Sequence, residues 1–318
     1  MPQAPQSSWI DPATLMRIKN LELRAKVVVE GFYHGLHRSP YHGFSVEFSE
    51  YRQYTPGDDP RYLDWRLFAR SDRYYVKRFE DETNLRCYLT LDTSHSMAFG
   101  SLAYTKAQYA ATLAATLAYF LSTQRDAVGL LTFDQHVGEF LPARYRPGHL
   151  HRLMLALERA PGGTATDLTA PLERIAELVA KRGLVALISD LLAPPDKLER
   201  DLGCLKSRGH EVVLFHVLDP AELTLNFENA ALFHDVESGR QLYVDPAAVR
   251  QEYLRRLGEH NASIERICSR LDIEYHRLST DQPLEIALFD FLRGRLERGK
   301  SVRRATGSRG PTTAKARP

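Results

Sequence analysis

Three polar residues alternate directly after an apolar segment of the chain. Asp92, Ser94 and Ser96 follow residues 86–91, whose apolar and β-branched character predicts a buried strand. In an open α/β sheet, ligands bind beyond the carboxyl ends of the strands, where these side chains are expected to lie. One carboxylate and two hydroxyls are hard oxygen ligands that suit Mg²⁺. The pattern indicates a metal site. The alternative is strand-end capping, because Asp and Ser side chains also bind nearby backbone groups.

Two later stretches add candidate ligands. Thr164 follows two glycines in a loop, which gives its hydroxyl freedom to reach the same point. Asp190 follows the continuously apolar residues 184–189 and is expected at a second strand end. Thr164 and Asp190 can thus join Asp92, Ser94 and Ser96 as candidate metal ligands, with the two aspartates acting directly or through bound water. Mg²⁺ is the expected ion, with Mn²⁺ or Ca²⁺ as alternatives, and a partner's carboxylate can fill an open coordination position.

Strands and helices that alternate along the chain position these residues. We predict strands at residues 86–91, 126–133, 137–141, 184–189, 211–218 and 273–278. We predict helices at residues 12–30, 102–123, 148–160, 168–181, 196–207, 247–271 and from 283 to about 298. The alternation implies right-handed crossovers and a three-layer α/β/α, Rossmann-like fold with a mostly parallel sheet. Residues 221–246 interrupt it and read as a β-hairpin insertion around Ser238 and Gly239.

The chain divides into three predicted parts. Residues 1–83 form an N-terminal helix and an aromatic, charged subdomain, residues 84–298 the α/β domain, and residues 299–318 a disordered basic tail. Short strands are expected near residues 45–50 and 74–79. The mixed charges and aromatics of the first part favour either ion pairs that hold it against the sheet domain or a docking face for a partner. The candidate docking residues are Arg52, Asp58, Arg61, Asp64, Trp65, Arg66 and Arg70.

Composition excludes several classes of protein. The three cysteines are far apart and form no C-x-x-C, which argues against a disulfide framework or a zinc site. No apolar run approaches the roughly 18 residues of a membrane span, and no signal peptide is visible, so a cytoplasmic location is expected. Residues 293–318 hold seven Arg, two Lys and one Glu, a net +8 that leaves −6 for the rest of a chain of net charge +2. Such a tail can contact nucleic acid or membranes, but we expect a solvated tail and no specific nucleic-acid partner.

The motifs resemble those of a known family. The D-x-S-x-S pattern, the Gly-Gly-Thr loop and the strand ending in Asp190 resemble the metal-ion-dependent adhesion site of von Willebrand factor A domains. The stretches at residues 48–66 and 75–80 look like the signature of the bacterial DUF58 family, in which this block directly precedes a von Willebrand A-like domain that begins D-x-S-x-S-M. Asp92, Ser94, Ser96 and Met97 fit that start, and the resemblance covers about residues 31–298.

The resemblance implies a protein-binding adaptor and no established enzymatic activity. Family members are thought to act with MoxR-type AAA+ ATPases in assembling or maturing other proteins, so such an ATPase and an unidentified client protein are the expected partners. An adhesion-type site can stand empty until a partner binds. The alternative is a metal-dependent hydrolase or phosphatase at the same strand end. Against it, Ser94 replaces the second aspartate of a D-x-D-x-T phosphotransfer site and cannot act as an acid or base near neutral pH. No nucleotide-binding motif appears.

Overall fold

A six-stranded sheet runs through the part of the chain that the structure describes. The computed structural model describes residues 9–38, 51–53, 75–77, 85–159, 169–179, 182–227, 229–234 and 241–306. The strand order is β10-β7-β6-β3-β4-β5, and every neighbouring pair is parallel except β4 and β5. The strands are β3 (Arg86–Asp92), β4 (Ala127–Phe133), β5 (Val137–Arg144), β6 (Leu184–Ser189), β7 (Glu211–Leu218) and β10 (Glu274–Ser279).

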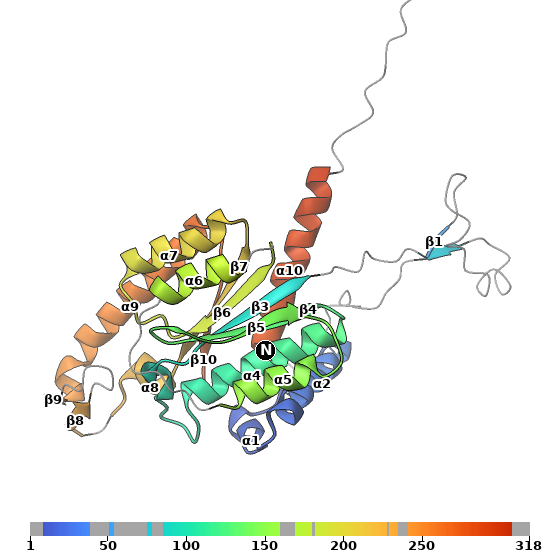
Figure 1. Ribbon diagram of the computed structural model, residues 1–318. Coiled ribbons are helices and arrows are strands. Elements are labelled where there is room, and N and C mark those ends of the chain that lie inside the picture. The colour runs from blue at the N-terminus through green and yellow to red at the C-terminus, as the bar shows by residue number, and fades with distance from the viewer. Residues whose placement is uncertain are drawn as a thin grey trace, which may run out of the picture.

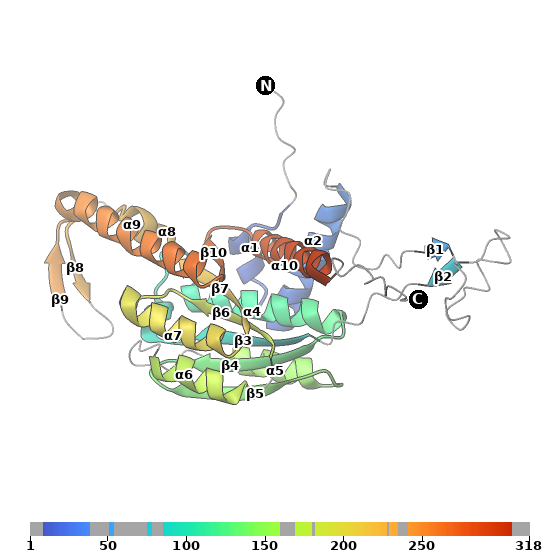
Figure 2. The same cartoon turned by 90° about the horizontal axis from the view of Figure 1, so that it is seen from above.

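Helices cover both faces of this sheet, which confirms the predicted mostly parallel α/β fold (Figures 1 and 2). Alternate residues of β3 face opposite layers: Leu89 and Leu91 lie in one buried cluster, and Tyr88 in the other. The first cluster is closed by α2 (Leu21–Arg38), α4 (Lys106–Thr123), α5 (His149–Leu157) and α10 (Leu284–Thr306). The second is closed by α6 (Thr169–Leu178), α7 (Pro195–Ser207) and α9 (Pro246–Arg270).

The N-terminal helix differs from the prediction. Instead of one helix over residues 12–30, the chain forms α1 (Pro12–Met16) and then α2. The Asn20 side chain accepts a hydrogen bond from the backbone N–H of Leu23 at 2.7 Å, which caps the new helix. Arg24 of α2 donates to Thr112 Oγ1 of α4 at 2.7 Å. α2 therefore shares a buried core cluster with α4. The division of the chain at residue 83 stays a prediction.

The helix after the site loop begins later than predicted. α4 starts at Lys106, and residues 102–104 precede it as a loop. Thr105 and Gln108 form a reciprocal capping box: Gln108 N donates to Thr105 Oγ1 at 3.2 Å, and Thr105 N donates to Gln108 Oε1 at 3.0 Å. Tyr104 is buried and donates its hydroxyl to the Thr280 carbonyl at 2.7 Å. Lys106 is therefore the first helical residue, at the edge of the sheet where β3 ends.

The predicted hairpin insertion is present, with an additional short helix. Strands β8 (Ala231–His234) and β9 (Gln241–Val244) pair antiparallel at the outer end of α9 (Figures 1 and 2). The unpredicted α8 (Pro220–Thr224) begins in a second capping box, made by Asp219 and Glu222. This box fixes the Glu222 carboxylate, because the Asp219 N–H donates to Glu222 Oε2 at 2.8 Å.

Two short strands lie in the N-terminal region. β1 (Tyr51–Gln53) and β2 (Tyr75–Lys77) pair antiparallel. The second agrees with the strand predicted near residues 74–79. The predicted strand at residues 45–50 lies outside the described residues, and β1 begins just after it.

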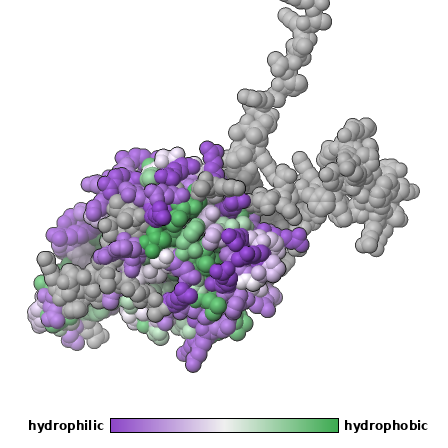
Figure 3. All heavy atoms as spheres, viewed as in Figure 1, coloured by the Kyte–Doolittle hydropathy of each residue, from purple (hydrophilic) through white to green (hydrophobic). Residues whose placement is uncertain are grey.

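The last helix is longer than expected. α10 runs to Thr306, which corrects the predicted helix end near Arg298 and the predicted start of disorder at residue 299. Among the described residues, no helix combines the length and apolar character that a membrane crossing requires. Figure 3 shows hydrophilic residues around an apolar area in the middle of one face.

Candidate functional site

The predicted site residues that the structure describes lie where the sheet reverses its strand order. From β3, the chain's next strand β4 lies on one side, and β6 followed by β7 lies on the other. The carboxyl ends of β3 and β6 therefore flank the topological switch point, where open α/β sheets bind ligands. Asp92 ends β3 and Asp190 follows β6, and both side chains are buried.

Asp92 is held by two hydrogen bonds. Its Oδ1 accepts from the Ser94 backbone N–H at 2.9 Å, and its Oδ2 accepts from Ser189 Oγ at 2.5 Å. The first bond is the kind expected if Asp92 caps the strand end, which is the alternative to a metal site. Part of the role of Asp92 is therefore structural. Ser189 was not predicted. The register places it beside Asp92, because Leu91 of β3 pairs with Ile188 of β6.

Ser94 and Ser96 lie in the turn that follows β3. Ser94 is fully buried, Ser96 is 7% exposed, and their Oγ atoms share a hydrogen bond over 3.1 Å. Ser96 lies in a short 3-10 helix, η2 (His95–Ala98), whose Met97 is fully buried in the core and anchors the turn. The close Oγ atoms can bind one small cation together.

Asp190 has one oxygen bound and one free among the described residues. Its Oδ2 accepts from Lys106 Nζ at 2.8 Å, whereas the buried Oδ1 has no hydrogen-bond partner there. The backbone is fixed nearby. His216 Nε2 donates to the Asp190 carbonyl at 2.9 Å, and Leu191 turns the chain with a left-handed φ of 54°. An unpartnered buried carboxylate oxygen is costly unless a cation or water meets it.

The two carboxylates repel each other. Burial raises the pKa of Asp92 to about 7, and the neighbouring charge of Asp190 adds to this, although the bonds from Ser189 and Ser94 oppose it. A divalent ion placed between these groups relieves the repulsion and satisfies the free oxygen. The residues present thus fit a divalent cation. Among the described residues, no three His, Cys, Asp or Glu side chains form a metal-binding group. A cation at this point would therefore need hydroxyl oxygens as well as carboxylates for its ligands.

Lys106 is the main residue that sequence reasoning missed. Its ammonium is fully buried and binds Asp190 Oδ2 at 2.8 Å and Glu222 Oε1 at 2.6 Å. Burial opposes the charge, but these two carboxylates outweigh that effect and raise the pKa of Lys106 above its ordinary value. The sequence signal was the Thr105–Gln108 capping box, which places Lys106 at the start of the helix and thus at the site edge.

Several predicted residues cannot be placed at this site. Thr164 lies outside the described residues, so its role as a ligand stays a prediction. Of the predicted docking residues, Arg52 lies in β1. The others lie outside the described residues, namely Asp58, Arg61, Asp64, Trp65, Arg66 and Arg70.

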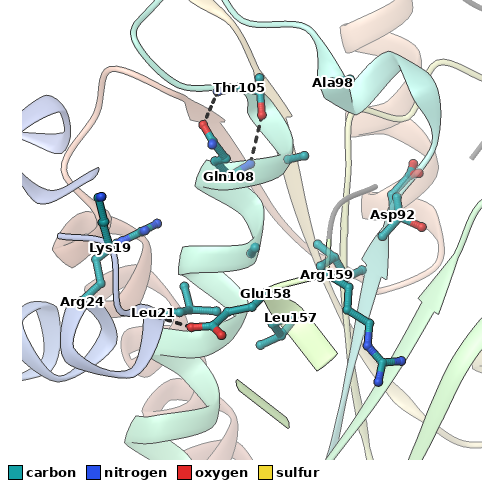
Figure 4. A pocket seen from close by; sticks show the side chains of 14 residues that line it. Lys19, Leu21, Arg24, Asp92, Ala98, Thr105, Gln108, Leu157, Glu158 and Arg159 are labelled. Carbon is teal, nitrogen blue, oxygen red and sulfur yellow. Dashed lines mark hydrogen bonds between the residues drawn. The ribbon is translucent and has the colours of Figure 1, made fainter. Parts of the chain in front are cut away.

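A cavity of about 420 Å³ adjoins Asp92. Figure 4 shows Asp92 and Arg159 on one side of α4, and Lys19 and Arg24 on the other. Arg24 donates hydrogen bonds to the Ile18 carbonyl and to Thr112 Oγ1, whereas Lys19 forms no ion pair among the described residues. Polar groups of both signs therefore line the space beside the strand end.

The chain is similar to proteins of one described family. Residues 50–263 match the family model described as protein of unknown function DUF58. The uncharacterized protein Rv1480 of Mycobacterium tuberculosis (strain ATCC 25618 / H37Rv) is 30% identical over 277 residues, 86% of each chain. The uncharacterized protein Mb1516 of Mycobacterium bovis gives the same values.

Similar solved structures include the conserved hypothetical protein BatB from Bacteroides thetaiotaomicron and the SpRpn10 VWA domain. BatB is 15% identical and covers 66% of this chain and 98% of its own, with a TM-score of 0.46. The SpRpn10 domain is 13% identical and covers 64% of this chain and 93% of its own, with a TM-score of 0.39. The fold assignment comes from the sheet order and the two helical layers described above.

Proposed function

Because the chain belongs to the DUF58 family, we propose that it is a non-enzymatic, protein-binding adaptor module with a divalent ion at its switch point. The ion, Mg²⁺ in the first instance, is bound by Ser94, Ser96 and Thr164, with Asp92 and Asp190 as direct ligands or through water. Its open position takes a carboxylate from a partner protein. When bound, the ion supplies residual positive charge for that acidic residue.

One observation carries this proposal. Two buried carboxylates, those of Asp92 and Asp190, lie close enough to repel each other, and Asp190 Oδ1 has no hydrogen-bond partner among the described residues. A purely structural cap does not require a second buried carboxylate. A cation site requires negative charge, and the adjacent Ser94 and Ser96 hydroxyls complete an oxygen donor set.

Exposed apolar side chains near the site favour a protein as the ligand. Phe99 and Leu102 follow the serines and are 40% and 38% exposed, and Leu192 follows Asp190 and is 48% exposed. Exposed apolar side chains grouped on one part of a surface are typical of protein interaction sites. The cavity beside Asp92 has room for residues next to the partner's carboxylate.

The resemblance described above is the basis for the partner that we propose. We propose a MoxR-type AAA+ ATPase as the protein with which this module acts, in the maturation or assembly of other protein complexes. The adaptor role requires the ion site to bind either this ATPase or its client.

Isothermal titration calorimetry with MgCl₂ tests the ion. We expect the wild-type chain to bind Mg²⁺ and the Ser94→Ala/Ser96→Ala variant to lose this binding. A Ser207→Ala/Ser263→Ala variant is the matched control, because these exposed hydroxyls bond only within their own helices: both donate to carbonyls, and Ser263 also accepts from Arg266. Equal affinity in the wild type and the Ser94/Ser96 variant would refute the assignment.

A binding assay with the purified MoxR-type ATPase of the same organism tests the partner. We expect the complex in Mg²⁺, and a weaker complex in EDTA or with the Ser94/Ser96 variant. The hydrolase alternative is tested with p-nitrophenyl phosphate. Metal-dependent turnover that is lost in Asp92→Ala would replace the adaptor function with an enzymatic one.

A further inference from the structure

Lys106 occupies a position that is unfavourable for a lysine in two ways. It is fully buried, and it is the first residue of α4, where the helix dipole presents its positive end. Residues that break such rules concentrate at functional sites and are compensated by neighbours. Here the compensation comes from Asp190 and Glu222, at 2.8 Å and 2.6 Å from the ammonium.

The two oxygens of the Asp190 carboxylate have different surroundings. Oδ2 faces Lys106, and Oδ1 is free among the described residues to face an ion. Both residues that bind the Lys106 ammonium, Asp190 and Glu222, are themselves fixed by hydrogen bonds. The Asp190 backbone is held by His216, and Glu222 is held by the Asp219 N–H. An ion that approaches Asp190 therefore meets a positive charge that cannot easily move away.

We infer that Lys106 is a built-in competitor of the divalent ion for Asp190 and sets a low affinity of the site for Mg²⁺. This inference rests on the ion site of the proposed function and names the residue that tunes it. Positive charges a few ångströms apart in a buried site repel strongly, because water screens them poorly. A partner carboxylate adds negative charge on the open side of the ion and offsets this repulsion. Ion and partner therefore bind more tightly together than separately.

Removing the ammonium tests the competition. In calorimetry with MgCl₂ at constant ionic strength, we expect Lys106→Met to bind Mg²⁺ at least tenfold more tightly than the wild type. Lys206→Met is the matched control and should leave the Mg²⁺ affinity unchanged. Lys206 also pairs with an aspartate, donating to the Asp272 carbonyl at 2.7 Å, but at the amino ends of the strands.

A second variant is needed in case Lys106→Met does not fold. Lys106→Met leaves two buried carboxylates without their ammonium, and it can fail to fold. Lys106→Met/Glu222→Gln removes one charge of each sign, so the net charge of the site stays that of the wild type. We expect this double variant to bind Mg²⁺ at least tenfold more tightly than the wild type as well, because Asp190 is released in both. If the double variant binds Mg²⁺ with wild-type affinity, the inference is overturned, because the Mg²⁺ affinity would then depend on the net charge of the site and not on the release of Asp190 from Lys106.

The outcomes separate this inference from the proposed function. If wild-type binding depends on Ser94 and Ser96 and the double variant binds no more tightly, the inference fails and the proposed function stands. If Mg²⁺ binds only when Lys106 is replaced, the inference stands and the ion-dependent function of the wild type fails. Absence of Mg²⁺ binding in every variant overturns both.

Discussion

Replacing Asp92 with asparagine should stabilise the metal-free protein. The Asn side chain keeps an oxygen for the Ser94 N–H. Its amide faces Ser189 Oγ, which already accepts from the Leu191 N–H, so the Ser189 hydroxyl loses its carboxylate acceptor, and this loss reduces the gain worked out below. The substitution removes the charge that is buried beside Asp190. An ordinary structural cap gives the opposite expectation, because the loss of its charged hydrogen bonds should destabilise the fold.

The size of the effect follows from the raised pKa. The pKa of Asp92 is about 7 in the fold, against an ordinary value of 3.8, because burial and then Asp190 disfavour the charged form. Above pH 7 the folded protein therefore carries the full cost of ionising Asp92. This rise in the pKa of Asp92 corresponds to a cost of about 4 kcal/mol in the free energy of folding when Asp92 is ionised. Rearrangement around the new amide and relaxation of the charged pair reduce this, so we expect a gain of about 1–3 kcal/mol at pH 8.

Urea unfolding at pH 8 provides the assay. In EDTA, the Asp92→Asn variant should unfold at a higher urea concentration than the wild type. With Mg²⁺ added, the wild type should gain stability, because the ion binds only the folded state, and the variant should gain less. Asp126→Asn is the control for the response to Mg²⁺. Asp126 is also buried with a raised pKa of about 6, but it lies at the amino end of β4, away from the site.

Two results would contradict this reasoning. A loss of more than about 1 kcal/mol in EDTA would show that the charged hydrogen bonds of Asp92 matter more than its repulsion from Asp190. An equal gain from Mg²⁺ in the wild type and in Asp92→Asn would place the ion elsewhere.

Three further predictions concern the fold. Phe32→Ala should lower the free energy of unfolding by about 3–5 kcal/mol, measured by urea unfolding, because α2 is part of the main core and Phe32 packs edge-on against Phe120. Gly129→Ala should lower the urea midpoint clearly, because an added Cβ would lie 2.7 Å and 2.8 Å from backbone atoms of neighbouring β5. Burial lowers the pKa of His149, which bonds the Val128 carbonyl at 2.8 Å, so the fold keeps this ring neutral while the unfolded chain takes up a proton below about pH 6.5. The stability that neutral His149 contributes, measured as the difference between the wild type and His149→Gln, should fall from pH 7 to pH 5, as followed by thermal unfolding of both proteins.

Strands buried on both faces were the most predictable elements. β6 and β7 have the predicted bounds, because parallel strands covered by helices are continuously apolar along the chain. Their order in the sheet was not predictable from such runs. The reversal between β3 and β6, which places Asp92 near Asp190, depends on packing between segments far apart in the sequence.

Helix starts were less predictable where side chains decide them. The apolar residues at 102–104 extend the helical pattern of α4, but Tyr104 is buried against the Thr280 carbonyl and Thr105 caps the helix after it. For the same reason, Asn20 divides the N-terminal helix. Lys106 was missed because an isolated lysine has the same sequence pattern whether it is solvated or buried, and only Asp190 and Glu222 distinguish the two cases.

The most direct measurement of the central proposal is an anomalous difference map from crystals of the full chain grown with saturating Mn²⁺. Mn²⁺ substitutes for Mg²⁺ at oxygen sites and scatters anomalously. We expect one peak at the switch point, at about 2.0–2.3 Å from the Ser94 and Ser96 hydroxyl oxygens and next to Asp190 Oδ1. Well-diffracting crystals with no peak there, or with Mn²⁺ only at other carboxylates, would contradict the ion site and with it the proposed mode of partner binding.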